Sequence, residues 1–336
     1  MSSEILEFYK LKDNPFKLDI ILKTFVGYET ERYQVLNAIN NGEKIILILG
    51  PTGAGKTTLL QWLNANLGSK NRKYLHRPPN SINNLAEIVY KEFFSFIEKI
   101  FYFRKDPSKI LSKKKVIFLI DEATFLLDDM IEWIKVLADQ TKSIFVLAAL
   151  PEFEERVLRD HRTFYERIIT KIYLKSLDPK SGRELIKKRL ELAGNPNLFT
   201  DGAIDAIYKI TGGFPREMLK IAYECLIVGY KERKNIIDEE VVKKVYEYKK
   251  PPEITIKLTD KQRVIVEYIL KYGPKSANEL LELLKDKYKD MTINALSNLL
   301  KRMVENGYLV RTKVKNKYVY DITSAIKNIF IRESFK

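Results

Sequence analysis

An eight-residue glycine-rich segment constrains this chain more than any other feature. It reads Gly50-Pro51-Thr52-Gly53-Ala54-Gly55-Lys56-Thr57 and lies between the apolar run at 45–49 and a helical pattern over 57–67. Its three glycines let the backbone curl so that its amides face a phosphate group at the positive end of the next helix. Together with Thr58, the segment is predicted to bind nucleotide phosphates, with Lys56 reaching the β- and γ-phosphates and Thr57 binding Mg²⁺.

Two acidic residues form the second motif. Asp121 and Glu122 follow the apolar run at 116–120, about 65 residues after the glycine-rich segment. In open α/β sheets, ligands bind at the carboxyl ends of the strands, which is where these acids are expected. Asp121 is predicted to hold Mg²⁺ and Glu122 to polarise the attacking water. The two motifs together predict a P-loop NTPase that hydrolyses its nucleotide as well as binding it.

Strand and helix patterns alternate through the first half of the chain. Short β-branched runs at 44–49, 73–76, 116–120, 143–150 and 169–174 are separated by helical patterns such as 57–67 and 82–101, which predicts an α/β fold with a parallel sheet. Helical patterns then follow at 179–193, 201–211, 215–229 and 239–248, with Asp178, Thr200 and Asp238 as expected N-caps. We expect a nucleotide-binding α/β domain over 1–175, an all-α lid over 176–250, a proline-containing linker, and a further domain over 254–336.

Five short motifs, in this order, carry a resemblance to a known family: Phe25-Val26-Gly27-Tyr28, Ile120-Asp121-Glu122-Ala123, Leu150-Pro151-Glu152-Phe153, Tyr165-Glu166-Arg167-Ile168 and Gly212-Gly213-Phe214-Pro215-Arg216. With the glycine-rich segment, they resemble the AAA+ ATPases. Within these, the chain is similar to the clade of archaeal origin-recognition initiators, transposition helper ATPases and secretion-associated ATPases. The resemblance covers nearly the whole chain.

The resemblance implies roles for several residues. ATP is expected between the sheet domain and the lid, with Arg216 facing the γ-phosphate as the second sensor. Arg167 resembles the arginine finger that reaches the ATP of a neighbouring subunit, although Arg159 and Arg162 lie close by. A homo-oligomer or a partner ATPase would then complete the site. Val26 and Tyr28, beside Phe25, would contact the adenine, or these side chains simply pack the core.

The sequence departs from the family pattern at the end of the fourth strand. Family members usually place a polar residue there to orient water, whereas this chain reads Leu147-Ala148-Ala149-Leu150. None of these side chains forms hydrogen bonds. We therefore expect slow, switch-like hydrolysis.

Residues 254–336 have the winged-helix pattern, with helices over 260–272, 277–288 and 292–306 and strands over 308–314 and 317–322. In the third helix the predicted core stripe comprises Ile293, Leu296, Leu299, Leu300, Met303 and Val304. The opposite face is polar and is suited to a major groove. In the hairpin, Arg311, Lys313 and Lys315 are expected to alternate onto one face, together with Lys317 across the turn, as a wing that grips phosphates requires. The predicted contacts to duplex DNA are Asn298, Lys301, Arg302, Arg311, Lys313, Lys315 and Lys317.

Charge supports this assignment. The chain has 59 Lys and Arg against 44 Asp and Glu, a formal net charge of +15. Residues 254–336 hold 17 Lys and Arg against 9 Asp and Glu, which places +8 in 83 residues. A polyanionic partner accounts for such a local excess better than the alternative, a lysine-rich surface typical of thermophiles. One cysteine, Cys225, and two histidines exclude a disulfide framework and a Cys/His metal cluster.

The leading hypothesis is an ATP-switched protein that binds double-stranded DNA, initiator-like or remodelling DNA, with ATP and Mg²⁺ as cofactors and DNA replication as the best-fitting process. A transposition helper ATPase is the alternative within the DNA class. A signal-transduction NTPase whose winged helix binds protein partners is the alternative from another class. No membrane span or export signal is evident, so a cytoplasmic protein is expected.

Overall fold

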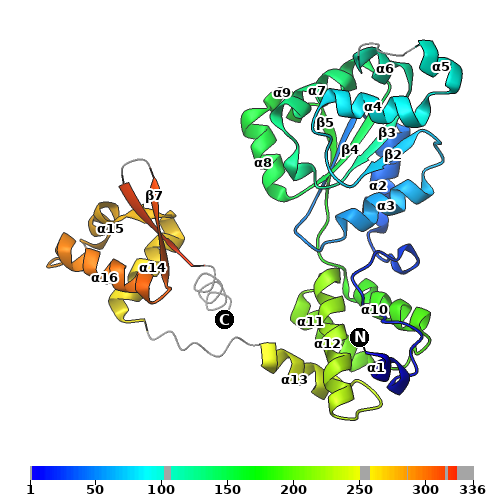
Figure 1. Ribbon diagram of the computed structural model, residues 1–336. Helices are drawn as coiled ribbons and strands as arrows, with labels where there is room; N and C mark the ends of the chain where they lie inside the picture. The colour runs from blue at the N-terminus through cyan, green and yellow to red at the C-terminus, as the bar shows by residue number, and fades with distance from the viewer. Residues whose placement is uncertain (1, 102–106, 250–257, 286, 315–316, 324–336) are drawn as a thin grey trace. The chain divides into compact units, whose positions relative to one another are not determined.

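The computed structural model describes residues 2–101, 107–249, 258–285, 287–314 and 317–323 (Figure 1). The chain divides into two compact units, Met1–Lys250 and Pro251–Lys336. Among the helices in the described ranges, none is both long and apolar enough to cross a membrane.

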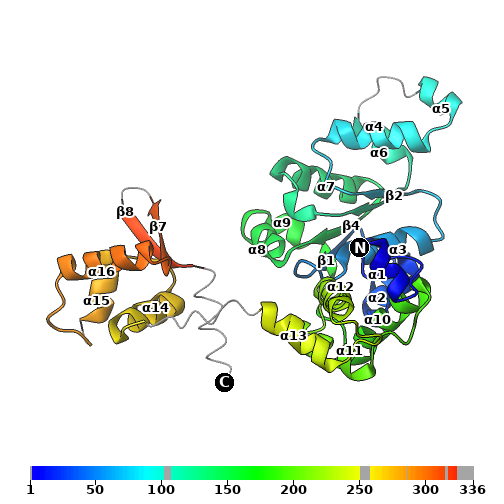
Figure 2. The same cartoon turned by 60° about the horizontal axis from the view of Figure 1, so that its bottom comes forward.

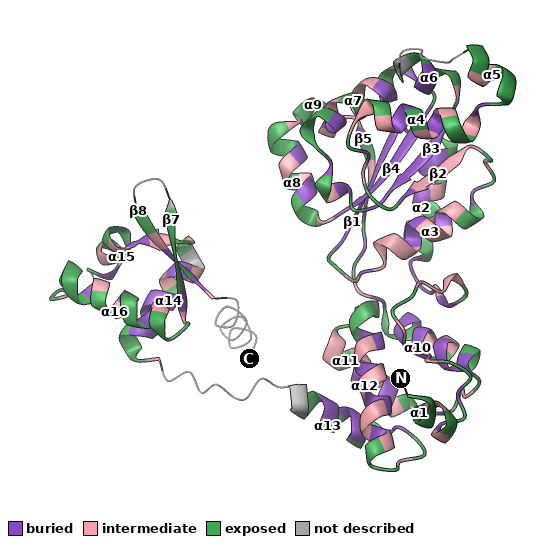
Figure 3. Ribbon diagram, in the orientation of Figure 1, coloured by how far each residue is buried: buried purple, intermediate pink, exposed green. Residues whose placement is uncertain are grey.

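A five-stranded parallel sheet forms the centre of the first unit, with the strand order β2-β3-β4-β1-β5. Its strands are β1 (Ile45–Leu49), β2 (Arg72–Leu75), β3 (Ile117–Ile120), β4 (Ile144–Ala149) and β5 (Ile168–Tyr173). The three central strands are buried along their whole length (Figure 3), as a sheet covered by helices on both faces requires. The predicted parallel sheet is confirmed, and each strand end lies within one residue of its predicted position.

The two sheet faces carry separate hydrophobic cores. On one face, Ile46 and Ile48 of β1 pack in the same cluster as α2 and α3, whereas Ile45 and Leu47 face the cluster of α4, α7, α8 and α9. Figure 2 shows the helices on both sides of the sheet. The elements of this part are α2 (Glu29–Asn40), α3 (Lys56–Asn66), α4 (Ile82–Phe93), α5 (Phe96–Phe101), α6 (Pro107–Lys113), α7 (Asp128–Gln140), α8 (Pro151–Asp160), α9 (Arg162–Tyr165) and the 3₁₀ turns η1 (Leu22–Thr24) and η2 (Ala123–Phe125).

The helix predicted over 82–101 is two helices. The chain leaves α4 at Phe94, whose backbone is extended and whose side chain is buried. Ser95 then starts α5: its hydroxyl lies 3.4 Å from the Glu98 amide, and the Glu98 carboxylate accepts from the Ser95 amide at 2.9 Å. This reciprocal cap is the Ser-x-x-Glu pattern. It outweighs the continuous apolar periodicity that predicted one helix.

Four lid helices follow the sheet: α10 (Pro179–Ala193), α11 (Asp201–Thr211), α12 (Pro215–Lys231) and α13 (Glu239–Lys249). Asp178 and Thr200 cap the first two, accepting from the amides of Ser181 and Ala203. Asp238 accepts from the Val241 amide at 3.1 Å. The three predicted N-caps are therefore confirmed.

The N-terminal segment packs against the lid helices rather than against the sheet. Its short helix α1 (Ser3–Phe8) lies beside α12 (Figure 1). Phe16 contacts Phe199 edge to face at 5.4 Å, and the Lys12 amide donates to the Ala193 carbonyl at 2.8 Å. The chain then passes from the lid helices to the sheet over residues 20–28. The sequence pattern did not indicate this packing.

The second unit consists of α14 (Asp260–Tyr272), α15 (Ala277–Leu284), α16 (Ile293–Glu305) and an antiparallel sheet of β6 (Lys275–Ser276), β8 (Lys317–Ile322) and β7 (Leu309–Val314). Two predictions need correction here. The helix predicted to reach residue 288 ends at Leu284, and Ile293, assigned to the core stripe, is 37% exposed at the start of α16. The strand β6 was not predicted, because two residues give no periodic signal. Leu296, Leu300 and Met303 form the buried stripe as expected.

Candidate nucleotide-binding site

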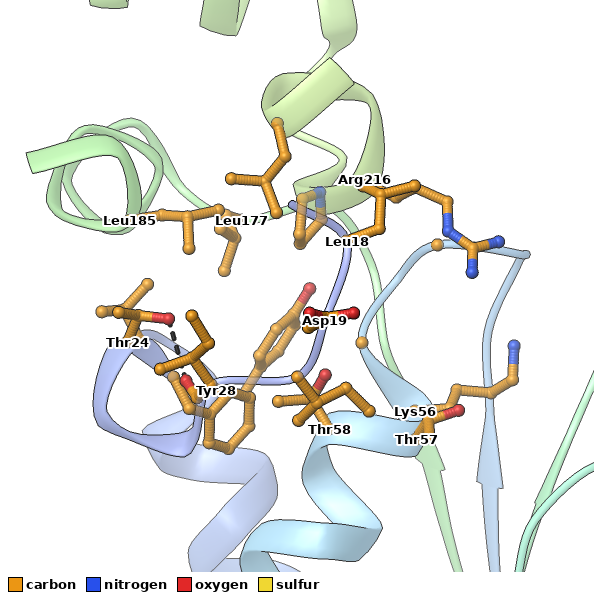
Figure 4. Close-up of a pocket in the computed structure, with 18 of the residues that line it drawn as sticks. Leu18, Asp19, Thr24, Tyr28, Lys56, Thr57, Thr58, Leu177, Leu185 and Arg216 are labelled. Carbon is orange, nitrogen blue, oxygen red and sulfur yellow. Dashed lines mark hydrogen bonds between the residues drawn. The ribbon is translucent and has the colours of Figure 1, made fainter. Parts of the chain in front are cut away.

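A cavity of about 260 Å³ lies where the phosphate loop (residues 50–57), the N-terminal segment and the lid helices meet (Figure 4). Six of the nine predicted phosphate-contact residues line it: Thr52, Gly53, Gly55, Lys56, Thr57 and Thr58. Of the other residues predicted to serve this site, Glu122, Arg216, Val26 and Tyr28 also line it. The cavity therefore brings together residues from positions 18 to 219 of the chain.

The phosphate loop requires glycine at position 53 for two reasons. Its φ of +84° is a left-handed conformation that other residues rarely adopt, and a Cβ there would lie 3.0 Å from the Cβ of Arg216. Gly55, with a φ of +96°, then turns the chain into α3, which begins at Lys56. The loop thus passes directly beneath the arginine of the lid, and a side chain at position 53 would push the two apart.

Lys56 lies at the centre of the charged part of the cavity. Its Nζ donates to the carbonyl oxygens of Gly50 at 2.6 Å and Pro51 at 3.0 Å. Burial lowers the pKa of Lys56, Glu122 and Asp121 partly oppose this, and the nearby Arg216 lowers it further. Glu122 and Arg216 line the same cavity as Lys56, whereas Asp121 is not among the residues that line it.

Asp121 and Glu122 are held at the carboxyl end of β3. Asp121 is 4% exposed, and its carboxylate accepts from the Tyr74 hydroxyl at 3.0 Å and from the Glu122 amide at 2.9 Å. Burial, followed by the charge of Asp121, raises the pKa of Tyr74. Glu122 has a left-handed φ of 51°, which is unusual outside glycine and turns the chain sharply after Asp121. Tyr74 was missed by sequence reasoning, because nothing local links β2 to β3.

The end of β4 is apolar in the structure as well as in the sequence. Ala148 and Ala149 are fully buried, and Leu150 lines the cavity. The Leu150 amide donates to the Thr124 hydroxyl at 2.8 Å. That bond joins β4 to the segment that follows Glu122, but Thr124 is not among the residues that line the cavity.

The opposite part of the cavity is apolar and suits a planar base. Val26 and Tyr28 are both buried and both line the cavity, so packing and ligand contact are compatible there. The Tyr28 hydroxyl lies 2.8 Å from the carbonyl oxygens of Ala54 and Lys175, and burial raises the pKa of Tyr28. From the other elements, Ile21, Leu177, Leu185 and Leu219 complete the apolar wall.

Arg189 of α10 is a cavity residue that the sequence analysis missed. It is only 5% exposed, and its guanidinium donates to the carbonyl oxygens of Lys17 at 3.2 Å and Asp19 at 3.0 Å. These bonds attach the N-terminal segment to the lid beside the apolar part of the cavity. One signal was available: Arg189 interrupts the apolar stripe of α10 between Ile186 and Leu190.

The candidate arginine fingers are all paired within the chain. Arg167 forms a bidentate ion pair with Asp139, with its Nε and Nη2 2.9 Å and 2.8 Å from the carboxylate oxygens. Arg162 pairs with Glu166 and Arg159 with Asp160. Arg167 is not among the residues that line the cavity of its own chain.

The predicted DNA contacts lie on the second unit. Asn298, Lys301 and Arg302 of α16 are exposed, as are Arg311, Lys313 and Lys317 of the hairpin. Lys315 lies outside the described residues. One expectation is wrong: Lys317 pairs with Val314, so it projects from the opposite face to Arg311 and Lys313, which pair with Tyr320 and Tyr318. The tight turn sets this register, which alternation within one strand does not reveal.

Comparisons with known proteins agree with this architecture. Residues 39–157 match the protein family described as AAA domain. The structure of the ORC2 protein of Aeropyrum pernix in its ADPNP-ADP complexes is 14% identical, with a TM-score of 0.55 over 97% of this chain and 100% of that chain. The fold is that of an AAA+ P-loop NTPase.

Two further structures share the AAA+ fold. The Thermotoga maritima RuvB Holliday junction branch migration motor is 20% identical, with a TM-score of 0.51 over 94% of this chain and 98% of that one. The Aeropyrum pernix ORC1 protein in complex with DNA is 16% identical, with a TM-score of 0.51 over 98% and 96%. A search of curated proteins gives no match. At these identities the likeness defines the fold, so function must be argued from the site.

Proposed function

We propose that this protein is an ATP-dependent switch that binds double-stranded DNA. The first unit binds ATP and hydrolyses it slowly, and the second unit binds duplex as a winged helix. One observation carries the ATP part: Lys56, Glu122 and Arg216, which come from three separate elements, line one cavity beside the apolar wall. Charged groups at one end and an apolar slot at the other suit a nucleoside triphosphate.

Mg²⁺ fits the donors at this site. Thr57 and Asp121 offer a hydroxyl and a carboxylate, the hard oxygen ligands that Mg²⁺ prefers. Within the described residues, no group of three or more His, Cys, Asp or Glu side chains is arranged to hold an ion. That agrees with an ion bound by one or two protein oxygens together with nucleotide phosphates. Mg²⁺ bound there supplies neutralisation of the phosphate charge.

The side chains of the cavity have separate roles in binding ATP and hydrolysing it. Lys56 places its ammonium at the β- and γ-phosphates after leaving the carbonyls of Gly50 and Pro51. Glu122 orients the attacking water, and Arg216 stabilises charge on the γ-phosphate from the lid. Leu150, at the end of β4, supplies no polar group to help position the water. Slow turnover follows, which suits a protein that changes state and does not translocate.

DNA binding is supported by the second unit and by two relatives. Three helices followed by a hairpin form the winged-helix order, and the exposed side of α16 carries Asn298, Lys301 and Arg302. Arg311 and Lys313 share one face of β7, as contacts to a phosphate backbone require. ORC1 is described in complex with DNA and RuvB as a branch migration motor. An initiator-like or DNA-remodelling role fits these relatives best.

Assembly is part of this proposal. Arg167 lies outside its own cavity and pairs with Asp139. As an arginine finger it would leave Asp139 when a second copy, or a partner ATPase, presents ATP to it. Hydrolysis would then depend on assembly.

Fluorescence anisotropy with a labelled random-sequence duplex tests the proposal. Binding is measured at two salt concentrations with ADP, with ATP, and with Glu122→Gln in ATP, which retains the triphosphate. We expect salt-sensitive binding that changes with nucleotide, because phosphate contacts release counterions. The double variant Arg311→Ala/Lys313→Ala should weaken binding, whereas its matched control Lys287→Ala/Lys289→Ala, exposed lysines of the same unit, should not. Failure of the wild type to bind at low salt refutes the DNA part and leaves a nucleotide switch for protein partners.

A further inference from the structure

A row of lysines lies at the amino-terminal edge of the sheet, at the opposite end of the strands from the phosphate loop. Arg72, Ile117 and Ile144 pair side by side across β2, β3 and β4. Lys70, Lys115 and Lys142 each stand two residues before these paired residues. We name these three lysines the lysine row.

The pairing continues from the strands toward the lysine row. The Ile117 amide donates to the Asn71 carbonyl at 2.9 Å, and the Ile144 amide donates to the Val116 carbonyl at 3.0 Å. The three lysines therefore lie in the segments that lead into three adjacent strands, each two residues before the first residue of its strand. With neighbouring strands 4.7–4.9 Å apart, the row extends over about 10 Å.

The three lysines of the row form no ion pairs within the part of the chain that the structure describes. All three lysines are exposed, and no carboxylate of the described residues lies within 4.0 Å of any of them. Glu98 pairs with Lys114, the residue before Lys115, at 2.8 Å, and Asp139, three residues before Lys142, pairs with Arg167.

Lys44, which precedes the neighbouring strand β1, adds a fourth positive charge to this edge. Its Nζ donates to the Thr141 carbonyl at 2.9 Å. Burial lowers the pKa of Lys44, and the positive charges of Lys115 and Lys142 lower it further. Glu43 beside it has a buried Oε2 without a hydrogen-bond partner. Glu43 offsets part of the positive charge of Lys44, and the three exposed lysines of the row, which have no ion pair among the described residues, are suited to an extended polyanion.

We propose that the lysine row is a second contact for the phosphate backbone of double-stranded DNA, on the ATPase unit and separate from the winged helix. The inference rests on the proposed DNA-binding function and extends it. Three exposed ammonium groups that precede neighbouring strands present several cations to a phosphate backbone and provide no means of reading bases, so the contact adds affinity without sequence preference. An acidic protein would also be attracted to this charge, and the experiment distinguishes the two.

The test compares full-length variants by duplex anisotropy over a series of salt concentrations. The row variant is Lys70→Ala/Lys115→Ala/Lys142→Ala. Its matched control is Lys209→Ala/Lys231→Ala/Lys243→Ala, three exposed lysines of the lid helices that lack ion pairs within the described residues and carry the same total charge. Each lost phosphate contact reduces the magnitude of the slope of log affinity against log salt concentration by about 0.9. With three lysines replaced, the slope of the row variant should be smaller in magnitude than that of the wild type by up to ~2.7. The control should keep the wild-type slope.

Two further measurements keep the result interpretable. Melting temperature and fluorescent ADP affinity should match the wild type in both triple variants, because the substituted side chains are exposed and make no ion pairs. Lys142→Gln alone should lower the slope by about 0.9, which guards against a triple variant that folds poorly.

The outcomes separate this inference from the proposed function. A row variant that behaves like the lid control, while Arg311→Ala/Lys313→Ala weakens binding, overturns the second contact and leaves the winged-helix contact intact. Equal losses in the row and lid variants point to total charge alone and also overturn it. A wild-type protein that binds no duplex overturns both, and an acidic protein then becomes the candidate occupant of the row.

Discussion

Replacing Arg189 with methionine tests whether the lid holds the N-terminal segment beside the cavity. The guanidinium donates to the carbonyl oxygens of Lys17 and Asp19 from a position that is 5% exposed. A hydrogen bond from a charged donor contributes about 1.5–3 kcal/mol. Arg189→Met loses two of these hydrogen bonds and leaves two carbonyl oxygens unpaired, which destabilises the folded protein. It also removes the cost of burying the guanidinium charge, whose Nε atom has no hydrogen-bond partner, and this offsets part of the loss. We expect a net loss of about 3 kcal/mol.

Thermal unfolding measures this loss. A change of 1 kcal/mol moves the melting temperature by roughly 2–4 °C in a domain of 150–250 residues, so Arg189→Met should lower it by roughly 6–12 °C. The same variant should weaken fluorescent ADP binding about tenfold, equivalent to ~1.4 kcal/mol, because Ile21 and Thr24 lose their fixed position along the cavity wall.

Two comparisons make the test specific. Arg189→Lys keeps the charge and one donor position, so it should fall between the wild type and Arg189→Met. Lys187→Met changes an exposed side chain of the same helix, whose ion pair with Asp201 lies at the surface, and should change stability by less than about 0.5 kcal/mol. If Arg189→Met melts with the wild type and binds ADP equally well, Arg189 does not hold the segment in place.

Three further predictions concern charged groups. Arg216→Ala should weaken ATP binding more than ADP binding in fluorescence titrations, since its partner is the γ-phosphate, and equal losses would contradict this role. The ATP turnover per protomer should rise with protein concentration in the wild type but not in Arg167→Ala. In Asp139→Asn the rise should occur at lower protein concentration, because Arg167 loses its partner within the chain. A wild-type turnover that is independent of protein concentration would count against an arginine finger. Burial lowers the pKa of His161, but its hydrogen bonds to Glu132 and Asp128 outweigh burial, so the pKa is raised. The charged imidazole therefore stabilises the folded protein fully below the unfolded-state pKa of about 6.5, and this stabilisation is lost as pH rises through the raised folded-state pKa. The difference in melting temperature between wild type and His161→Asn should shrink with rising pH, and a difference that grows would refute the assignment.

Local patterns predicted the sheet and the charged half of the cavity well. The phosphate loop and the Asp121-Glu122 pair are contiguous residues whose spacing is itself the signal, and both follow strands whose apolar runs are distinct. The N-caps Asp178 and Thr200 were found for the same reason, because a cap bonds to an amide three residues away. In each case the interaction that fixes the structure lies within one short stretch of chain.

The missed features depend on contacts between distant parts of the chain. Arg189 bonds to residues about 170 positions earlier, and Tyr74 meets Asp121 across two strands. The lysine row becomes visible only when the register of β2, β3 and β4 is known, since its members are scattered along the sequence. For the hairpin, alternation placed Arg311 and Lys313 together, but the position of Lys317 depended on the turn.

The cavity lies where the chain passes twice between the sheet and the lid helices, over residues 20–28 and again after β5. The Tyr28 hydroxyl sits between both passages and the phosphate loop, 2.8 Å from the carbonyl oxygens of Lys175 and Ala54. If the lid turned about these two connections, Arg216 would change its position relative to Gly53. The hydrogen bond from Tyr28 to the Lys175 carbonyl would then either move with the lid or break. Because Arg189 bonds the N-terminal segment to the lid, the apolar wall of the cavity should move together with Arg216. If the cavity binds ATP as we propose, loss of the γ-phosphate would therefore act on both ends of the cavity at once, and hydrolysis would change the orientation of the lid.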